Sequence, residues 1–214
     1  MSSYSIVQAG ESRSFPAAHA FLEQASQGDA PGLVYLGAQA GSAFARGEGH
    51  AQRAFVAIEL GTECLGTHTD ERRGLEGSNV VGFARFRLGD ADPSPLVELV
   101  RQPGTQPEAL EAARAAFQSA GLVVAVCGDF PGRIVDRLIR PYFNAALRRL
   151  DEKLASADDL DKTLCLGLGY PEGPISLLER TGLAHHFQVT QALYEALGQS
   201  DYAPARRARV AAAR

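Results

Sequence analysis

The chain has few of the residues from which disulfide-stapled domains, metal centres and membrane spans are built. Its three cysteines lie far apart in 214 residues, so neither a disulfide framework nor a C-x-x-C pattern is present. Its five histidines show no H-x-x-x-H or H-E-x-x-H spacing, and we expect no metal ion. A net charge of −4 argues against general nucleic-acid binding. No apolar run approaches the roughly 18 residues of a membrane span. Because residues 1–10 also lack a signal-peptide pattern, we expect a cytoplasmic protein.

The chain also lacks the glycine-rich turn of dinucleotide-binding domains. That turn, G-x-G-x-x-G, lets the backbone approach a pyrophosphate at a helix N-terminus. The first apolar run here is followed by residues 8–13, QAGESR, which hold one glycine and place the negative charge of Glu11 near any phosphate. Residues 37–42, after the second run, miss the pattern as well, and Gly167 and Gly169 follow a helical segment. The sequence therefore predicts no NAD-binding site of the usual kind, and we expect no cofactor.

Hydrophobic patterning in the first 130 residues is typical of an α/β protein. Hydrophobic residues make up 45% of the chain, enough for a sizeable core. Helices are predicted over residues 15–25 and from a capping box at Thr105–Glu108 to a stop at Gly121. Strands alternating with helices indicate a largely parallel sheet. Short apolar runs predict strands at residues 5–7, 33–36, 55–60, 80–86, 96–100 and 122–127.

From residue 131 the pattern becomes helical throughout. Further helices are predicted after an N-cap at Ser156, over residues 174–182 and over residues 187–197. We expect a domain boundary near residue 130, a helical domain over 131–200 and a solvated basic tail over 201–214. One apolar stripe is richer than a single intramolecular contact requires, which predicts a homodimer through the C-terminal helices. The stripe consists of Val135, Leu138, Ile139, Tyr142, Phe143, Ala146, Leu147 and Leu150.

Two ordered motifs lie in the C-terminal half. Residues 129–138 read DFPGRIVDRL and residues 167–177 read GLGYPEGPISL. They resemble D-x-P-G-F-I-x-N-R-L and G-x-G-Y-P-x-G-P-x-x-L, the signature of the helical C-terminal domain of the 3-hydroxyacyl-CoA dehydrogenases. Further forward, residues 80–87 resemble V-I-G-x-H-F-F-N, residues 95–100 resemble P-L-V-E-V-V, and residues 66–70 resemble an A-S-N-T-S turn. The resemblance implies an α/β fold, with a shortened Rossmann-like parallel sheet followed by an all-α C-terminal domain, and a place in acyl-CoA metabolism of fatty or aromatic acids.

The resemblance also implies where the catalytic residues would stand. The family oxidises a 3-hydroxyacyl-CoA by hydride transfer to NAD, with a histidine–glutamate pair taking the hydroxyl proton and a serine and an asparagine holding the substrate oxygen. The glutamate is retained as Glu98. The histidine position holds Ala84, or Arg85 if the register slips by one, and neither is a base near neutral pH. The serine position holds Asp70 and the asparagine position holds Asp136.

The acidic residues left at these positions need a counter-charge. The resemblance places Glu98 and Asp136 around one substrate oxygen, and two carboxylates in a partly buried cleft cannot both ionise cheaply. We therefore expect an arginine, Arg85, Arg87 or Arg137, to neutralise them.

Three functions are compatible with this pattern. Loss of both the turn and the histidine favours a degenerate family member that acts as an acyl-CoA-binding or partner subunit. The second is an active NAD-dependent 3-hydroxyacyl-CoA dehydrogenase, with a divergent site that has repurposed Asp70, Glu98 and Asp136 or with a site completed by a partner. His68, His185 and His186 are the candidate substitute bases. The third is a structural or regulatory subunit of a full-length dehydrogenase, without a ligand.

Overall fold

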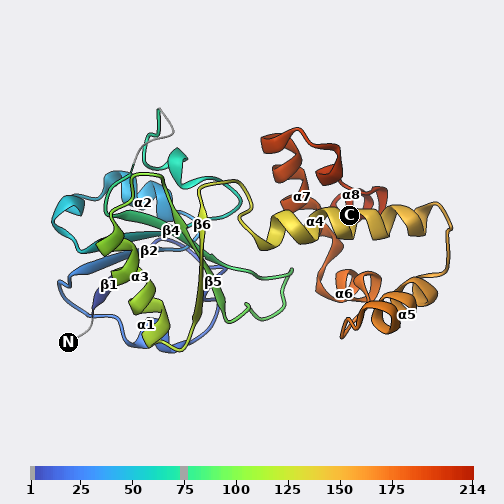
Figure 1. Ribbon diagram of the computed structural model, residues 1–214, viewed down its shortest axis with the longest axis horizontal. Helices are drawn as coiled ribbons and strands as arrows, with labels where there is room; N and C mark the ends of the chain where they lie inside the picture. Colours follow the sequence, from blue (N-terminus) through green and yellow to red (C-terminus); the bar gives the residue numbers. More distant parts are fainter. Residues whose placement is uncertain (1–2, 73–76) are drawn as a thin grey trace. The chain divides into compact units, whose positions relative to one another are not determined.

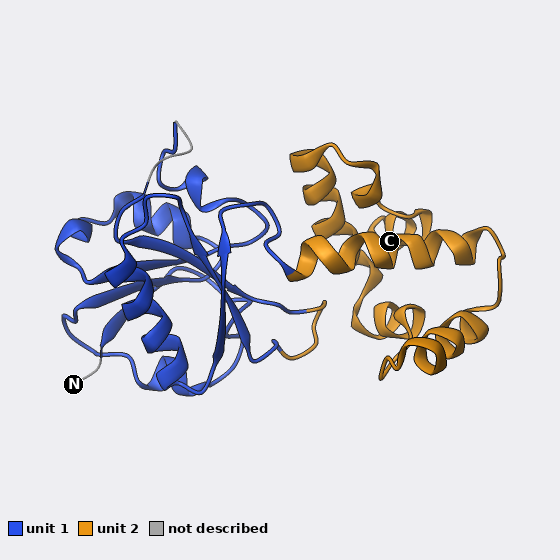
Figure 2. Ribbon diagram, viewed as in Figure 1, with its two compact units in different colours: residues 1–87, 93–134 blue, residues 88–92, 135–214 orange. Residues whose placement is uncertain are grey.

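The computed structural model describes residues 3–72 and 77–214, which form two compact units (Figures 1 and 2). Unit 1 comprises residues 1–87 and 93–134, and unit 2 comprises residues 88–92 and 135–214. The chain leaves unit 1 close to the boundary expected at residue 130. The segment 88–92 was not expected in unit 2, because it is the loop between two strands of unit 1.

Unit 1 is built on one mixed sheet. Its strands lie in chain order, and neighbours are parallel except for the antiparallel pair of the fourth and fifth. Each predicted strand is confirmed to within one residue at either end, and the largely parallel α/β fold with it. In the described part of the chain the strands are β1 (Tyr4–Gln8), β2 (Gly32–Leu36), β3 (Phe55–Glu59), β4 (Val80–Arg85), β5 (Leu96–Arg101) and β6 (Val123–Gly128).

Helices cover both faces of this sheet (Figure 1). On one face, α1 (Ala20–Glu23) and α3 (Pro107–Ser119) pack on strand residues through Phe21 and Phe117. On the other, α2 (Ala40–Arg46) and the 3₁₀ turn η2 (Leu65–Thr67) close a second core; a further 3₁₀ turn, η1, spans His50–Gln52. The inner strands β2 to β5 therefore bury both faces, whereas the edge strands β1 and β6 are partly exposed.

Two local predictions in unit 1 are wrong. The helix expected over residues 15–25 is reduced to α1, which begins late because His19 is its N-cap: His19 Nδ1 accepts from Phe21 N–H at 3.0 Å. The capping box before α3 does not form either. Thr105 Oγ1 accepts instead from the backbone N–H three residues earlier, and α3 begins without a side-chain cap, at a proline that has no N–H to satisfy.

Unit 2 is helical apart from the segment 88–92, and its predicted helices are confirmed. Ser156 is an N-cap, as predicted, since its Oγ accepts from Asp159 N–H at 3.1 Å. No helix in the described residues is long and apolar enough to cross a membrane. The helices are α4 (Val135–Asp151), α5 (Ala157–Leu168), α6 (Pro174–Thr181) and α7 (Leu183–Leu197), followed by the 3₁₀ turn η3 (Ser200–Tyr202) and α8 (Arg206–Ala212).

The solvated tail expected over residues 201–214 is a wrong prediction. η3 and α8 fold onto unit 2 and bury Tyr202 and Ala208. One contact explains why. Pro141 lies inside α4 and has no N–H for the carbonyl of Arg137, and the Tyr202 hydroxyl donates to that carbonyl at 3.0 Å. The C-terminal segment therefore satisfies a backbone acceptor that the proline leaves open.

A chain of buried polar side chains runs through unit 2 alongside its buried apolar residues. Arg140 donates from Nε to Asp136 at 2.7 Å and from Nη1 to His186 Nδ1 at 3.1 Å. The acceptor role of Nδ1 leaves the His186 proton on Nε2, which faces Asn144 Oδ1 at 3.0 Å. Asn144 then donates to Thr190 at 2.7 Å, which donates to an η3 carbonyl. Each hydrogen bond orients the next side chain, so one continuous network joins α4, α7 and η3.

We expect unit 2 to lose stability in mild acid. Burial first, and then the positive charge of Arg140, lower the pKa of His186 from 6.5 to about 3. Between these values the unfolded chain binds a proton that the folded chain does not. The stabilisation that comes from keeping His186 neutral should therefore be fully present above pH 6.5. Below that pH, the free energy of unfolding should fall by up to about 1.4 kcal/mol per pH unit as the pH drops toward 3. Urea unfolding of wild type and His186→Gln at several pH values measures this; His185→Gln, at a partly exposed neighbour, is the control. Equal pH slopes in wild type and His186→Gln would contradict the assignment.

Candidate functional site

The strand order of unit 1 differs from that of a dinucleotide-binding sheet. Such sheets hold their ligand at the carboxyl ends of the strands, where the strand order reverses. Among the strands in residues 3–72 and 77–214, the order runs from β1 to β6 without a reversal, and β1 lies at the edge (Figure 1). The crevice that a reversal creates beside the first strand is therefore not formed by these strands.

The loops at the carboxyl ends of β1 and β2 are packed against each other. Ala9 N–H donates to the Leu36 carbonyl at 2.6 Å, and the Ala9 carbonyl accepts from Gln39 N–H at 2.8 Å. Gly37 has φ +114°, and a Cβ there would lie 2.4 Å from the Gly10 carbonyl oxygen. The approach is thus possible only for glycine, which here serves loop packing. The side chain of Glu11, the charge expected to repel phosphate, is exposed.

Glu59, at the end of β3, lies beneath these two loops. Its carboxylate accepts from Ser12 Oγ at 2.9 Å, Ser14 N–H at 2.8 Å and Gly37 N–H at 2.7 Å. Sequence reasoning missed this residue. A carboxylate that ends an otherwise apolar run, FVAIE, was the available signal.

The register of β4 and β5 places Ala84 directly opposite Glu98, so the structure brings together the positions that the resemblance assigns to histidine and glutamate. Glu98 is buried in the face that packs on α2 and η2. Its Oε1 accepts from Ile134 N–H at 2.8 Å, and its Oε2 lies 3.9 Å from Nε of Arg133. Both side chains of this ion pair are 4% exposed. Arg133 also donates to the carbonyl of Gly61.

Two arginines outside the expected set pair with Glu98 and Asp136. Arg133 is an ion-pair partner of Glu98, and Arg140 is one of Asp136. Of the expected arginines, Arg85 lies on the opposite face of β4, where its guanidinium bonds the carbonyls of Ser14 and Ser94 at 2.8 Å each. The sequence carried a signal for each. Arg133 stands where the family motif has phenylalanine, and Arg140 follows Asp136 at the i, i+4 spacing of helical ion pairs.

Asp136 lies in the first turn of α4 and belongs to the polar chain of unit 2 described above. Its partner Arg140 is 1% exposed, so this carboxylate holds a buried cation in place. It therefore has a structural task in unit 2 whatever else it does.

Asp70 lies at the surface. It has φ +54° and pairs with Arg72 at 2.6 Å, and both side chains are more than three-quarters exposed. A different turn, residues 61–66, contacts the D-x-P-G motif: the Asp129 carboxylate accepts from the N–H groups of residues 65 and 66 at 2.7 Å each, and the carbonyl of residue 62 accepts from residue 132. Asp70 is outside this turn, and the structure does not group it with Glu98.

The candidate replacement bases have different surroundings. His186 is fully buried in the polar chain of unit 2, and His185 is partly exposed beside it. His68 lies in unit 1 with Nε2 at 3.3 Å from Glu63, and its ring rests on Gly41, where a Cβ would meet the ring. Burial acts to raise the pKa of Glu63, but hydrogen bonds from His68 and from a backbone amide outweigh it and leave the pKa below its ordinary value.

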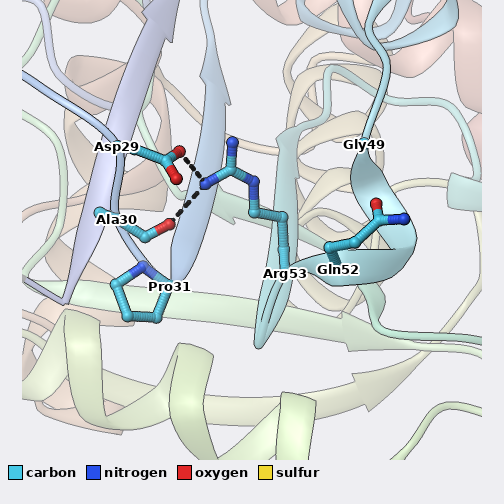
Figure 3. Close-up of a pocket in the computed structure, with 6 residues that line it drawn as sticks. All are labelled: Asp29, Ala30, Pro31, Gly49, Gln52 and Arg53. Carbon is cyan, nitrogen blue, oxygen red and sulfur yellow. Dashed lines mark hydrogen bonds and ion pairs between the residues drawn. The ribbon is translucent and has the colours of Figure 1, made fainter.

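A surface pocket at the other end of the sheet is built around Arg53, which bonds the Asp29 carboxylate and the Ala30 carbonyl (Figure 3). These residues precede β2 and β3, so the pocket lies at the amino ends of the strands, away from the carboxyl ends at which parallel sheets bind ligands. Among the described residues, no three His, Cys, Asp or Glu side chains are arranged to hold a metal ion.

Residues 132–213 match the family model of the 3-hydroxyacyl-CoA dehydrogenase C-terminal domain. The chain is 36% identical over 109 residues to a 3-hydroxybutyryl-CoA dehydrogenase of Bradyrhizobium diazoefficiens, covering 51% of this chain and 37% of that one. It is 41% identical over 88 residues to the mitochondrial hydroxyacyl-coenzyme A dehydrogenase of Sus scrofa, covering 41% and 28%. The matched residues thus span 37% of the first relative and 28% of the second.

Solved structures with this fold include the (S)-3-hydroxybutyryl-CoA dehydrogenase of Ralstonia eutropha, with a TM-score of 0.67 and 22% identity, covering 86% of this chain and 65% of that one. FadB2 of M. tuberculosis gives 0.69 and 21%, covering 85% and 65%. At these identities the likeness establishes the fold alone, a Rossmann-like sheet with a helical C-terminal domain. The family-model match and the curated relatives support one conclusion: residues 132–213 belong to the family of 3-hydroxyacyl-CoA dehydrogenase C-terminal domains.

Proposed function

We propose that this chain is a degenerate member of its family that serves acyl-CoA metabolism as an acyl-CoA-binding or partner subunit and does not itself transfer hydride. The observation that carries the proposal is the Ala84–Glu98–Arg133 arrangement. Where the family pairs a histidine with a glutamate, this chain has a methyl group opposite a glutamate that is ion-paired to a buried arginine.

The arrangement leaves no group at that point to accept a hydroxyl proton. A general base must come within hydrogen-bond reach of the proton it takes. Ala84 has no lone pair, Glu98 is turned to Ile134 N–H and Arg133, and a guanidinium stays protonated. The unreversed strand order and the packed loops after β1 and β2 support the same proposal on the cofactor side.

One observation favours the second candidate, an active dehydrogenase with a divergent or partner-completed site. His68 and Glu63 form a histidine–carboxylate pair on the turn after β3, and a carboxylate can orient an imidazole as a base. This pair would have to act on a bound substrate, with NAD held partly by another chain. Relatives named for 3-hydroxybutyryl-CoA make that ester the first substrate to try.

We further propose a homodimer through the helices of unit 2. The predicted stripe divides in the structure, with Phe143 and Leu147 buried inside the unit and Leu138 73% exposed. A groove between α4 and α5, lined by Tyr142, Leu154 and neighbouring apolar residues, lies open. Further apolar side chains on or beside α5 are also exposed, namely Leu166, Leu168 and Tyr170. Apolar surface of this kind on one protomer fits an interface between copies.

The proposed function predicts that the purified chain forms no NADH from NAD and 3-hydroxybutyryl-CoA, and that calorimetry detects no NAD binding. The same ester, or acetoacetyl-CoA, should raise the unfolding temperature, whereas 3-hydroxybutyrate without CoA should not. NADH formation by the chain alone would refute the proposal in favour of an active enzyme. If the CoA esters fail to stabilise the protein, the ligand-free subunit is the better account.

Breaking the Arg133–Glu98 pair should destabilise unit 1 strongly. Arg133→Met leaves Glu98 buried without its counter-charge, at a cost of about 3–5 kcal/mol. Adding Glu98→Gln removes the stranded charge, so the double variant should recover much of that loss. Urea unfolding of the two single variants and the double variant measures the coupling. The control is Arg72→Met, which breaks an exposed pair and should cost at most about 1 kcal/mol; equal losses in Arg133→Met and Arg72→Met would contradict a buried ion pair.

The unmodified chain should be a dimer at tens of micromolar by sedimentation or light scattering. Replacing Leu154 and Leu166 together by serine should weaken the dimer roughly tenfold or more. Val123→Ser, at an exposed apolar residue of unit 1, should leave it intact. Phe143 is unsuitable for this test because it is core. A monomeric unmodified chain would rule the homodimer out.

A further inference from the structure

We propose that the carboxylate of Glu59 is a built-in anion that fills an oxyanion-binding cradle made by Ser12, Ser14 and Gly37. The cradle is suited to one small carboxylate or phosphate-type oxyanion, and in this chain the occupant is a side chain of β3. The inference concerns unit 1 alone and holds whether or not the chain binds acyl-CoA.

The geometry is that of a bound oxyanion. Oε1 of Glu59 accepts two hydrogen bonds, from Ser12 Oγ at 2.9 Å and from Ser14 N–H at 2.8 Å. Oε2 accepts one, from Gly37 N–H at 2.7 Å. The donors come from the loops after β1 and β2, and the acceptor comes from the end of β3. Both oxygens are therefore used, and three separate segments meet at one carboxylate.

The charge is balanced by dipoles rather than by a cation. Glu59 is 7% exposed, and within residues 3–72 and 77–214 no Lys, Arg or His nitrogen forms an ion pair with it. A buried carboxylate without a cation persists only if hydrogen bonds replace its hydration. Convergent amide and hydroxyl donors are also how proteins bind carboxylate and phosphate ligands.

The cradle includes the loop after β1. In a dinucleotide-binding sheet, the loop after the first strand presents backbone N–H groups to phosphate. Here the N–H groups of Ser14 and Gly37 already have an anion, supplied by the chain itself. An internal carboxylate costs no binding entropy and cannot dissociate, so it orders both loops permanently and keeps a free oxyanion out of them.

Removing the side chain should turn the cradle into a site for an added anion. Glu59→Ala leaves three donors unsatisfied and a space the size of a carboxylate, so its unfolding temperature should fall on the order of 5–10 °C. Sodium formate or inorganic phosphate should restore part of that loss, relative to chloride at equal ionic strength. Wild type should respond to none of them. The matched control is Glu11→Ala, which removes an exposed carboxylate from the same loop.

Glu59→Gln separates the cradle from a general salt effect. Glutamine keeps the volume but turns an amide N–H toward one of the donors, so the Glu59→Gln variant should be less stable than wild type and remain unresponsive to anions.

Rescue of Glu59→Ala by formate alone would identify a carboxylate cradle; rescue by phosphate as well would show that the cradle also takes phosphate-type anions. The proposal fails if Glu59→Ala is as stable as wild type, or if formate and phosphate stabilise Glu59→Gln or Glu11→Ala equally. Should Glu59→Ala not fold, hydrogen exchange of Glu59→Gln decides: the Ser14 and Gly37 amides should exchange faster than in wild type, and unchanged rates would overturn the inference.

Discussion

A buried carboxylate must be matched by hydrogen-bond donors or by a cation, and much of this structure follows from that requirement. Glu98 is enclosed by a sheet face and is matched by Arg133 and an amide. Asp136 holds Arg140 at the centre of the helical unit, and Glu59 collects donors from two loops. An unmatched charge at any of these places would cost several kcal/mol, a large fraction of the stability of a domain. The partners are therefore as constrained as the acids.

The match at Glu98 also explains how the sheet accommodates a buried carboxylate opposite Ala84. If Glu98 sat opposite an alanine with no other partner, it would be a buried charge without compensation. Arg133 supplies the compensation from the D-x-P-G segment, where it has φ +50° and follows Gly132 at φ +72°. These left-handed residues turn the chain so that the guanidinium reaches both Glu98 and the carbonyl of Gly61.

The sequence predicted the strands well and the buried ion pairs poorly, for a physical reason. Short apolar runs depend only on neighbours along the chain, so β1 to β6 were found to within one residue. The partners of Glu98 and Glu59 lie many positions away in the sequence, and no local period reveals them. The helix expected over residues 15–25 was predicted too long, since the His19 side chain caps the chain at Phe21 N–H and α1 begins only at Ala20. Helical motifs were recognised, but the roles of Asp136 and Asp70 had to be read from their contacts.

A proline inside α4 accounts for the packing of the C-terminal segment on unit 2. A proline in the middle of α4 removes a backbone donor, and without a replacement the carbonyl of Arg137 would be an unsatisfied acceptor in a partly buried place. The Tyr202 hydroxyl provides the donor, and the segment that carries it also supplies the carbonyls that end the polar chain through Asn144 and Thr190. The basic composition of residues 201–214 predicted a solvated tail, because composition carries no information about the backbone carbonyl that Tyr202 contacts. The arginines of the segment also contribute, since Arg207 pairs with Asp151 at 2.7 Å and Arg209 lies over the ring of Phe187.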